Sequence, residues 1–96
     1  MNLADVIRIL QEHQEDLKKM DVKSLAVFGS VARGDTHQDS DVDLLVEFSR
    51  PIGLFQFVDV KFYLEELLGT SVDLGTPRSL KPMIRDRILK EAVHVT

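Results

Sequence analysis

The apolar run over residues 41–48 carries two aspartates two positions apart, and this pattern constrains the fold more than any other. Successive side chains of an extended strand point to opposite faces of a sheet, so Asp41 and Asp43 share one face. Val42, Leu44 and Val46 then share the other face, which can lie against a hydrophobic core. The segment therefore predicts a strand with one buried apolar face and one acidic face.

The acidic face is unfavourable without a counter-ion, because aspartate is a poor strand former and each carboxylate disfavours ionisation of its neighbour. Mg²⁺ is commonly bound by one or two carboxylates together with substrate phosphates. A further strand is predicted over residues 71–74 and carries Asp73. If this strand lies beside the first, the carboxylates of Asp41, Asp43 and Asp73 could hold two metal ions. Asp73 could also accept the proton of an attacking hydroxyl.

A Gly-Ser pair ends the strand that we predict over residues 22–29. Gly29 would let a phosphate approach the backbone, and Ser30 would add a hydroxyl donor at the start of a short helical turn. Neither a Gly-Lys-Ser/Thr sequence nor Gly-x-Gly-x-x-Gly is present, which excludes a P-loop and a dinucleotide fingerprint. Taken alone, the turn is better explained as a plain corner with Ser30 as N-cap. In the same way, an isolated Asp-x-Asp would be better explained as exposed strand aspartates. The combination of both patterns favours a phosphate and metal site.

The residues after the turn allow two interpretations. Arg33 can brace the polar loop over residues 35–40 by pairing with a neighbouring aspartate (Asp35, Asp39 or Asp41), which we favour slightly, or it can reach a substrate phosphate. A Ser-His-Asp hydrolase built on Ser30 or Ser40 is not supported, because no Gly-x-Ser-x-Gly elbow is present. His37 lies in the polar loop without an orienting pattern, so we do not assign it as a metal ligand.

The rest of the chain is predicted to form the helices and edge strand that support these strands. An amphipathic helix is expected over residues 2–20, a largely buried helix over 54–68 and a last helix over 79–91 with its apolar side chains facing the core. A short edge strand is expected over 92–95. Helices and strands in this order predict an α+β (α/β-like) fold, in which helices pack on a small sheet. The length of 96 residues predicts a single domain, 1–96.

Composition narrows the class of protein. The absence of cysteine excludes disulfides and thiolate metal sites. No apolar run approaches a membrane span and no secretory start is present, so we expect a soluble, cytoplasmic protein without a membrane partner. The net charge of −4 argues against nucleic acid as a direct partner, although a local basic patch could still serve a triphosphate.

Four stretches together resemble the nucleotidyltransferases of the DNA polymerase β superfamily, and within it the minimal nucleotidyltransferase (MNT) group. They are Gly29-Ser30, Ala32-Arg33-Gly34-Asp35, Ser40-Asp41-Val42-Asp43-Leu44-Leu45-Val46 and Val72-Asp73-Leu74, with a further likeness over residues 76–81. The resemblance implies a nucleotidyltransferase fold with a mixed sheet, which binds ATP with Mg²⁺ and transfers a nucleotidyl group. It also implies that Gly29 and Ser30 hold the triphosphate, that Asp41 and Asp43 ligate metal, and that Asp73 is the third carboxylate and the base.

The resemblance also implies a partner. Many members of the MNT group are antitoxins that pair with a HEPN-type ribonuclease toxin and can add AMP to a toxin tyrosine. We therefore expect a protein adenylyltransferase that acts on its cognate toxin. Two alternatives remain: a non-catalytic nucleotide-binding module that neutralises its partner by occlusion, and transfer to a small molecule such as an aminoglycoside. The short chain favours a protein acceptor, because a small-molecule pocket would need a second domain or a homo-oligomer.

Overall fold

The computed structural model describes residues 2–34 and 41–95 and confirms an α+β fold. The predicted polar loop over residues 35–40, with His37 and Ser40, lies outside the described residues. The elements, in chain order, are α1 (Leu3–Glu12), α2 (Gln14–Lys19), β1 (Val22–Phe28), α3 (Gly29–Arg33), β2 (Val42–Phe48), α4 (Leu54–Leu68), β3 (Val72–Gly75), the 3₁₀ helix η1 (Pro77–Ser79), α5 (Pro82–Glu91) and β4 (Val93–His94).

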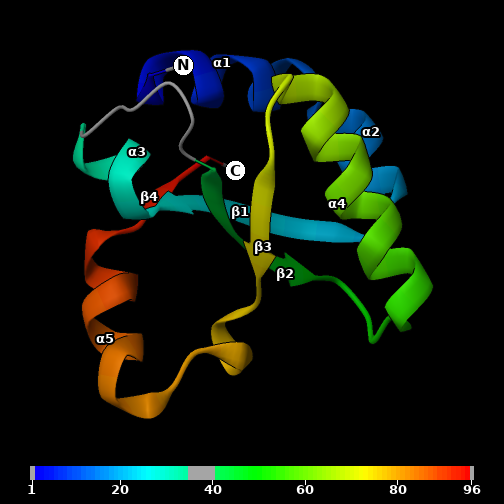
Figure 1. Cartoon of the computed structure of the whole chain (residues 1–96). Helices are drawn as coiled ribbons and strands as arrows, with labels where there is room; N and C mark the ends of the chain where they lie inside the picture. The colour runs from blue at the N-terminus through cyan, green and yellow to red at the C-terminus, as the bar shows by residue number, and fades with distance from the viewer. Residues whose placement is uncertain (1, 35–40, 96) are drawn as a thin grey trace.

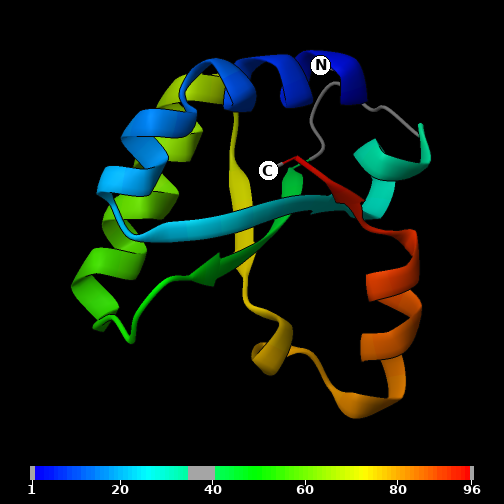
Figure 2. The same cartoon turned by 180° about the vertical axis from the view of Figure 1, so that it is seen from behind.

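The four strands form one mixed sheet in the order β3-β2-β1-β4. β1 is antiparallel to both β2 and β4, whereas β2 and β3 are parallel. A parallel pair needs a long crossover connection, which α4 supplies between β2 and β3. Figure 1 shows α1, α2 and α4 gathered along one side of the sheet. The view from behind in Figure 2 shows η1 and α5 standing apart from this helix layer.

The core lies between the sheet and the layer formed by α1, α2 and α4. Alternate residues of β2 are fully or almost fully buried in it, as the strand pattern predicts: Val42, Leu44 and Val46. α4 contributes Val60, Leu64 and Leu68 to the same core. Burial of these apolar side chains is the main force that holds the helix layer on the sheet. Asp43 alternates with the buried residues and so leaves the sheet on the opposite face.

The helix predicted over residues 2–20 is divided at His13. This residue has φ −111° and ψ 21°, outside the helical region, and its N–H donates to the Leu10 carbonyl at 3.2 Å. Its ring Nδ1 lies 2.9 Å from the Ile9 carbonyl oxygen. These contacts satisfy carbonyl groups at the end of α1, and the chain changes direction before α2 begins. The sequence pattern missed this break because the apolar spacing continues across it.

Two predictions about burial were wrong. α4 is not largely buried, because only the stripe that faces the sheet is covered, while Phe55 is 88% exposed and Phe62 is 60% exposed. α5 does not turn its apolar side chains into the core, and Met83 is 95% exposed. The helix begins at Pro82, whose missing N–H is tolerated at the first helical position. Within the described residues no helix is long and apolar enough to cross a membrane.

Candidate active site

The parallel register of β2 and β3 aligns two aspartates. Asp43 pairs with Asp73 across the strands, and the flanking pairs are Val42 with Val72 and Leu44 with Leu74. The Cα atoms of neighbouring strands lie about 4.8 Å apart, so the two carboxyl groups project side by side from the sheet. The structure therefore brings together the two strand aspartates that the sequence predicted as neighbours.

The electrostatics of Asp43 reflect this crowding. Burial raises the pKa of the Asp43 carboxyl above its ordinary value of 3.8, and the negative charges of Asp73 and Asp41 raise it further. A hydrogen bond with the Asp73 side chain acts in the same direction, while the positive charge of Arg33 lowers the pKa. Asp41 and Arg33 therefore both lie close enough to act on Asp43. The cluster disfavours its own negative charge and would gain from a bound cation.

The Gly-Ser turn lies directly against this acidic cluster. β1 ends at Phe28, which pairs with Asp43, and Gly29 then turns the chain into α3 with φ +72°. A Cβ atom on Gly29 would overlap Oδ2 of Asp43 and lie 3.0 Å from its Cγ. Glycine is thus required here for two independent reasons, the left-handed backbone and the close approach. Ser30 follows in α3 and is half-buried.

Arg33 makes a contact that the sequence did not predict. Its Nη1 lies 3.8 Å from Oε2 of Glu91, near the end of α5. Glu91 also lies 3.6 Å from Nε of Arg87 in the same helix. The spacing of Arg87 and Glu91 signals a pair within a helix, but no local pattern indicates a contact with a residue nearly sixty positions away. Two of the predicted partners of Arg33, Asp35 and Asp39, lie outside the described residues.

The donor set suits a hard divalent cation. Asp43 and Asp73 offer adjacent carboxylate oxygens, which are the ligands that Mg²⁺ prefers. Within residues 2–34 and 41–95, however, no group of three or more His, Cys, Asp or Glu side chains is arranged to hold a metal ion as it stands. Asp41 is exposed at the entrance to β2 and influences Asp43 through its charge. Two carboxylates with room for substrate oxygens fit Mg²⁺, whose protein ligands are commonly completed by phosphate.

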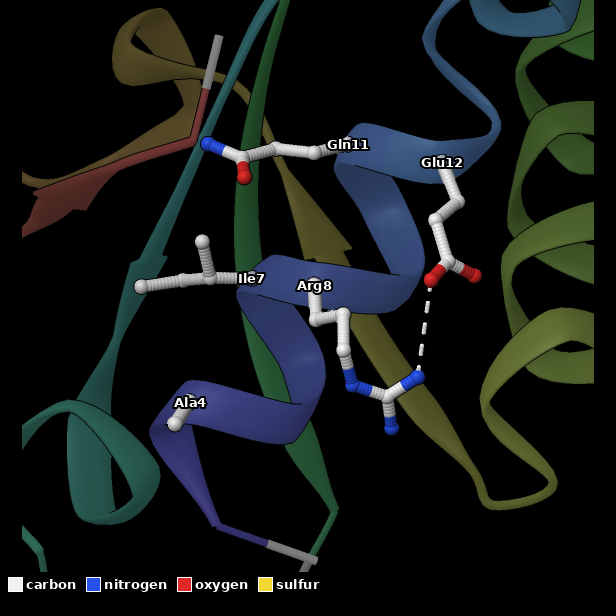
Figure 3. A pocket seen from close by; sticks show the side chains of 5 residues that line it. All are labelled: Ala4, Ile7, Arg8, Gln11 and Glu12. Carbon is white, nitrogen blue, oxygen red and sulfur yellow. Dashed lines mark ion pairs between the residues drawn. The ribbon is translucent and has the colours of Figure 1, made fainter.

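Two cavities lie away from the aspartates. One is a shallow hollow of about 540 Å³ along α1, where Arg8 lies 3.6 Å from Glu12, as Figure 3 shows. Its other lining residues are Ala4, Ile7 and Gln11. The second has a volume of about 600 Å³ and lies between the end of β2 and η1. Neither cavity is lined by Gly29, Asp43 or Asp73.

Comparison with known proteins identifies the class to which this fold and site belong. The family model described as "Nucleotidyltransferase domain" matches residues 7–95, so the chain belongs to the nucleotidyltransferase family and is an enzyme of that class. Within it, the chain is a member of the minimal nucleotidyltransferase group. A solved structure described as a minimal nucleotidyltransferase is 36% identical, with a TM-score of 0.82, and the match covers 97% of this chain and 95% of that one.

The sequence comparison agrees. Protein adenylyltransferase MntA of Thermococcus cleftensis is 41% identical over 96 residues, a match that covers 99% of this chain and 97% of the relative. A solved toxin-antitoxin structure with AMP-PNP has the same fold, with a TM-score of 0.70. That match covers 100% of this chain and 73% of the other chain, at 20% identity.

Proposed function

We propose that this chain is an Mg²⁺-dependent protein adenylyltransferase that moves AMP from ATP to a tyrosine of a HEPN-type toxin and so acts as an antitoxin. We further propose that residues 1–96 work as a single minimal nucleotidyltransferase domain. The observation that carries the proposal is the pairing of Asp43 with Asp73 directly against Gly29. The similarity to a relative named as a protein adenylyltransferase supports a protein acceptor.

Each residue of the site has a role in this proposal. Gly29 and Ser30 bind the triphosphate at the turn between β1 and α3, and Arg33 offers its guanidinium to a phosphate oxygen. Asp41, Asp43 and Asp73 are the residues that would hold Mg²⁺. When bound, Mg²⁺ neutralises phosphate charge and favours in-line displacement.

In the proposed transfer step, the acceptor oxygen replaces pyrophosphate on the α-phosphorus of ATP, and Asp73 takes up the proton. The acceptor hydroxyl oxygen forms a bond to the α-phosphorus of ATP, and the bond from that phosphorus to the bridging oxygen of the β-phosphate breaks. Pyrophosphate leaves, and the hydroxyl proton passes to the Asp73 carboxylate as general base. Asp43 pairs with Asp73 in the register of β2 and β3, so its carboxylate would hold the same cation from the neighbouring strand.

The test is transfer of label from ATP labelled in its α-phosphate to the partner protein. We expect the wild type with Mg²⁺ to label the partner, and Asp41→Asn with Asp43→Asn to abolish labelling. Asp86→Asn, at an exposed carboxylate on α5, is the matched control and should label normally. Mass spectrometry of the labelled partner should locate AMP on a tyrosine. A wild type that binds its partner tightly without labelling it would refute the catalytic proposal.

Neutralisation by occlusion is the second candidate, and the exposed apolar side chains of α4 favour it. Leu54, Phe55 and Phe62 are all more than half exposed and could cover a partner surface. The same double aspartate variant separates the two functions. If it still neutralises the partner at equal abundance, binding alone is sufficient and occlusion is the function.

A further inference from the structure

Glu91, the last residue of α5, places a carboxylate at an unfavourable position in its helix. The free carbonyl groups at the C-terminal end of a helix carry partial negative charge, so a cation is favoured there and a carboxylate is not. Two arginines offset the charge of Glu91. Arg33 of α3 has Nη1 3.8 Å from Oε2, and Arg87 of α5 has Nε 3.6 Å from Oε1. This departure from a local rule points to a role beyond helix stability.

The ends of α3 and α5 meet at this ion pair. Arg33 is the last residue of α3, and Figures 1 and 2 both show the end of α5 close to α3. α5 contacts α3 and β1, yet none of its ten described residues is buried. The contact of Glu91 with Arg33 therefore connects a thinly packed helix to the short helix that begins at Gly29.

Arg33 is attracted by carboxylates of two different elements. Its positive charge acts on the carboxyl group of Asp43 in β2, and its Nη1 lies 3.8 Å from Glu91 in α5. Asp43, Arg33, Glu91 and Arg87 thus form a series of alternating charges from β2 through α3 to α5. At 3.8 Å the contact with Glu91 is an ion pair without a hydrogen bond, so it takes up no N–H donor of the guanidinium.

The attraction to Asp43 would not survive the binding of a cation. When Mg²⁺ is bound, the charge of Asp43 is neutralised and the guanidinium of Arg33 is repelled by the cation. Glu91 is not among the proposed metal ligands, so its attraction for Arg33 persists. The Arg33 side chain is 53% exposed, and without Glu91 more of its rotamers would point into solvent. Glu91 is therefore the partner that can keep Arg33 in place in the loaded site.

We propose that Glu91 is a positioning residue for nucleotide binding, which holds the guanidinium of Arg33 close to Asp43, where it meets the triphosphate of ATP. The proposal rests on the proposed function, because it assumes that Arg33 binds a phosphate oxygen. A guanidinium has five N–H donors, so an ion pair on one side leaves donors for a phosphate on another. Arg87 contacts the other carboxylate oxygen of Glu91 and so orients it. α5 thereby contributes to the nucleotide site, although the sequence predicted no site residue on it.

The first test is calorimetric titration of the whole chain with ATP in the presence of Mg²⁺. For Glu91→Gln we expect a Kd about three to five times higher than that of the wild type, the effect of losing one partly exposed ion pair. Removal of a negative charge would by itself strengthen the binding of an anionic nucleotide, so a weaker affinity is specific to positioning. Asp86→Asn removes an exposed carboxylate from the same helix and is the matched control, which should bind ATP as the wild type does.

A double-mutant cycle then shows whether Glu91 acts through Arg33. Arg33→Gln alone should raise the Kd for ATP at least about tenfold, because it removes a charge-assisted hydrogen bond to phosphate. Addition of Glu91→Gln to this variant should raise the Kd no further. Without ligand, the thermal midpoint of Glu91→Gln should stay within about 4 °C of the wild type, as for a surface substitution. In the transfer assay, Glu91→Gln should raise the KM for ATP and leave kcat unchanged.

The other outcomes overturn the proposal. Equal or tighter ATP binding by Glu91→Gln would mean that Glu91 does not hold Arg33 at the phosphate. A further loss of affinity in the double variant, or a larger fall of the thermal midpoint, would mean that Glu91 acts through the fold and not through Arg33. A wild type that binds ATP but labels no partner would refute the proposed function and leave the binding data to decide the role of Glu91. A wild type that does not bind ATP would refute both.

Discussion

At the scale of single residues, Gly29 brings the turn between β1 and α3 directly against the carboxyl group of Asp43. Its φ of +72° and the overlap that a Cβ would make with Asp43 are separate constraints. We predict that Gly29→Ala lowers the free energy of unfolding and abolishes ATP binding, because Asp43 must move to make room. The left-handed backbone alone accounts for about 1–2 kcal/mol of the loss. Denaturant unfolding and calorimetric titration with Mg²⁺ and ATP measure the two effects.

Gly34 provides the matched control for this substitution. It also has a left-handed backbone, with φ +81°, but a Cβ there would meet nothing within 4 Å among the described atoms. Gly34→Ala should therefore show the backbone penalty and retain ATP binding. Equal loss of binding in the two variants would mean that the approach to Asp43 is not what makes Gly29 necessary.

Asp21 lies in the connection between α2 and β1 and contacts Arg50 in the connection between β2 and α4. It has a left-handed backbone, with φ +67°, and its carboxylate receives hydrogen bonds from Arg50 at 2.8 Å and from Gln56 at 2.9 Å. The hydrogen bond from Arg50 is the largest influence and lowers the pKa of Asp21 below its ordinary value of 3.8, with Gln56 acting in the same direction. The charged form is therefore favoured in the folded protein.

This shift predicts a pH dependence. Because the folded pKa is lowered, the contribution of Asp21 to stability is fully present above pH 3.8 and is lost as the pH falls through the folded pKa. Asp21→Asn keeps a side chain that tolerates the left-handed backbone but does not titrate. We expect it to be less stable than the wild type at neutral pH and to show a smaller loss of stability in acid. If the free energy of unfolding falls equally with pH in both proteins, this prediction is contradicted.

At the scale of elements, α4 has one face that packs in the core and another that is exposed to solvent. Leu64 is fully buried and Phe62 is 60% exposed two positions away. We predict that Leu64→Ala lowers the free energy of unfolding by about 2–5 kcal/mol, because it leaves a cavity in the core. Phe62→Gln should change stability by no more than about 0.5 kcal/mol. Denaturant unfolding measures both changes. A large loss of stability for Phe62→Gln would mean that the Phe62 ring packs against the rest of the folded chain, which would contradict this prediction.

The elements also show what the sequence could predict. α4 begins and ends at the predicted residues because Gly53 and Gly69 bound its apolar pattern. The alternation around Asp43 and Asp73 predicted the shared face, since pattern and register are coupled in a strand. The extent of burial of α4 and α5 could not be predicted, because composition does not tell how many faces neighbours will cover. The contact of Arg33 with Glu91 depends on the placement of α5 and leaves no local signal.

At the scale of the whole molecule, ligand binding should be visible as stability. We predict that ATP and Mg²⁺ together raise the thermal midpoint, because only the folded chain assembles Asp43, Asp73 and Gly29. At a hundredfold excess over Kd the gain is about 2.7 kcal/mol, which corresponds to roughly 13 °C for a chain of this size. Excess chelator should remove the gain without unfolding the protein. Asp43→Asn should show no gain, and an undiminished shift in that variant would contradict the proposed metal ligands.

The contacts of Val95 bear on how the chain is made. Its N–H donates to the Leu25 carbonyl at 2.8 Å, its own carbonyl accepts from Gln11 at 3.3 Å, and its side chain is buried. α1 and β1 therefore each form a hydrogen bond with a residue that is synthesised at least seventy positions later. On the ribosome Val95 cannot join this core until it has left the exit tunnel, so the nascent chain exposes until then the apolar surface that Val95 covers.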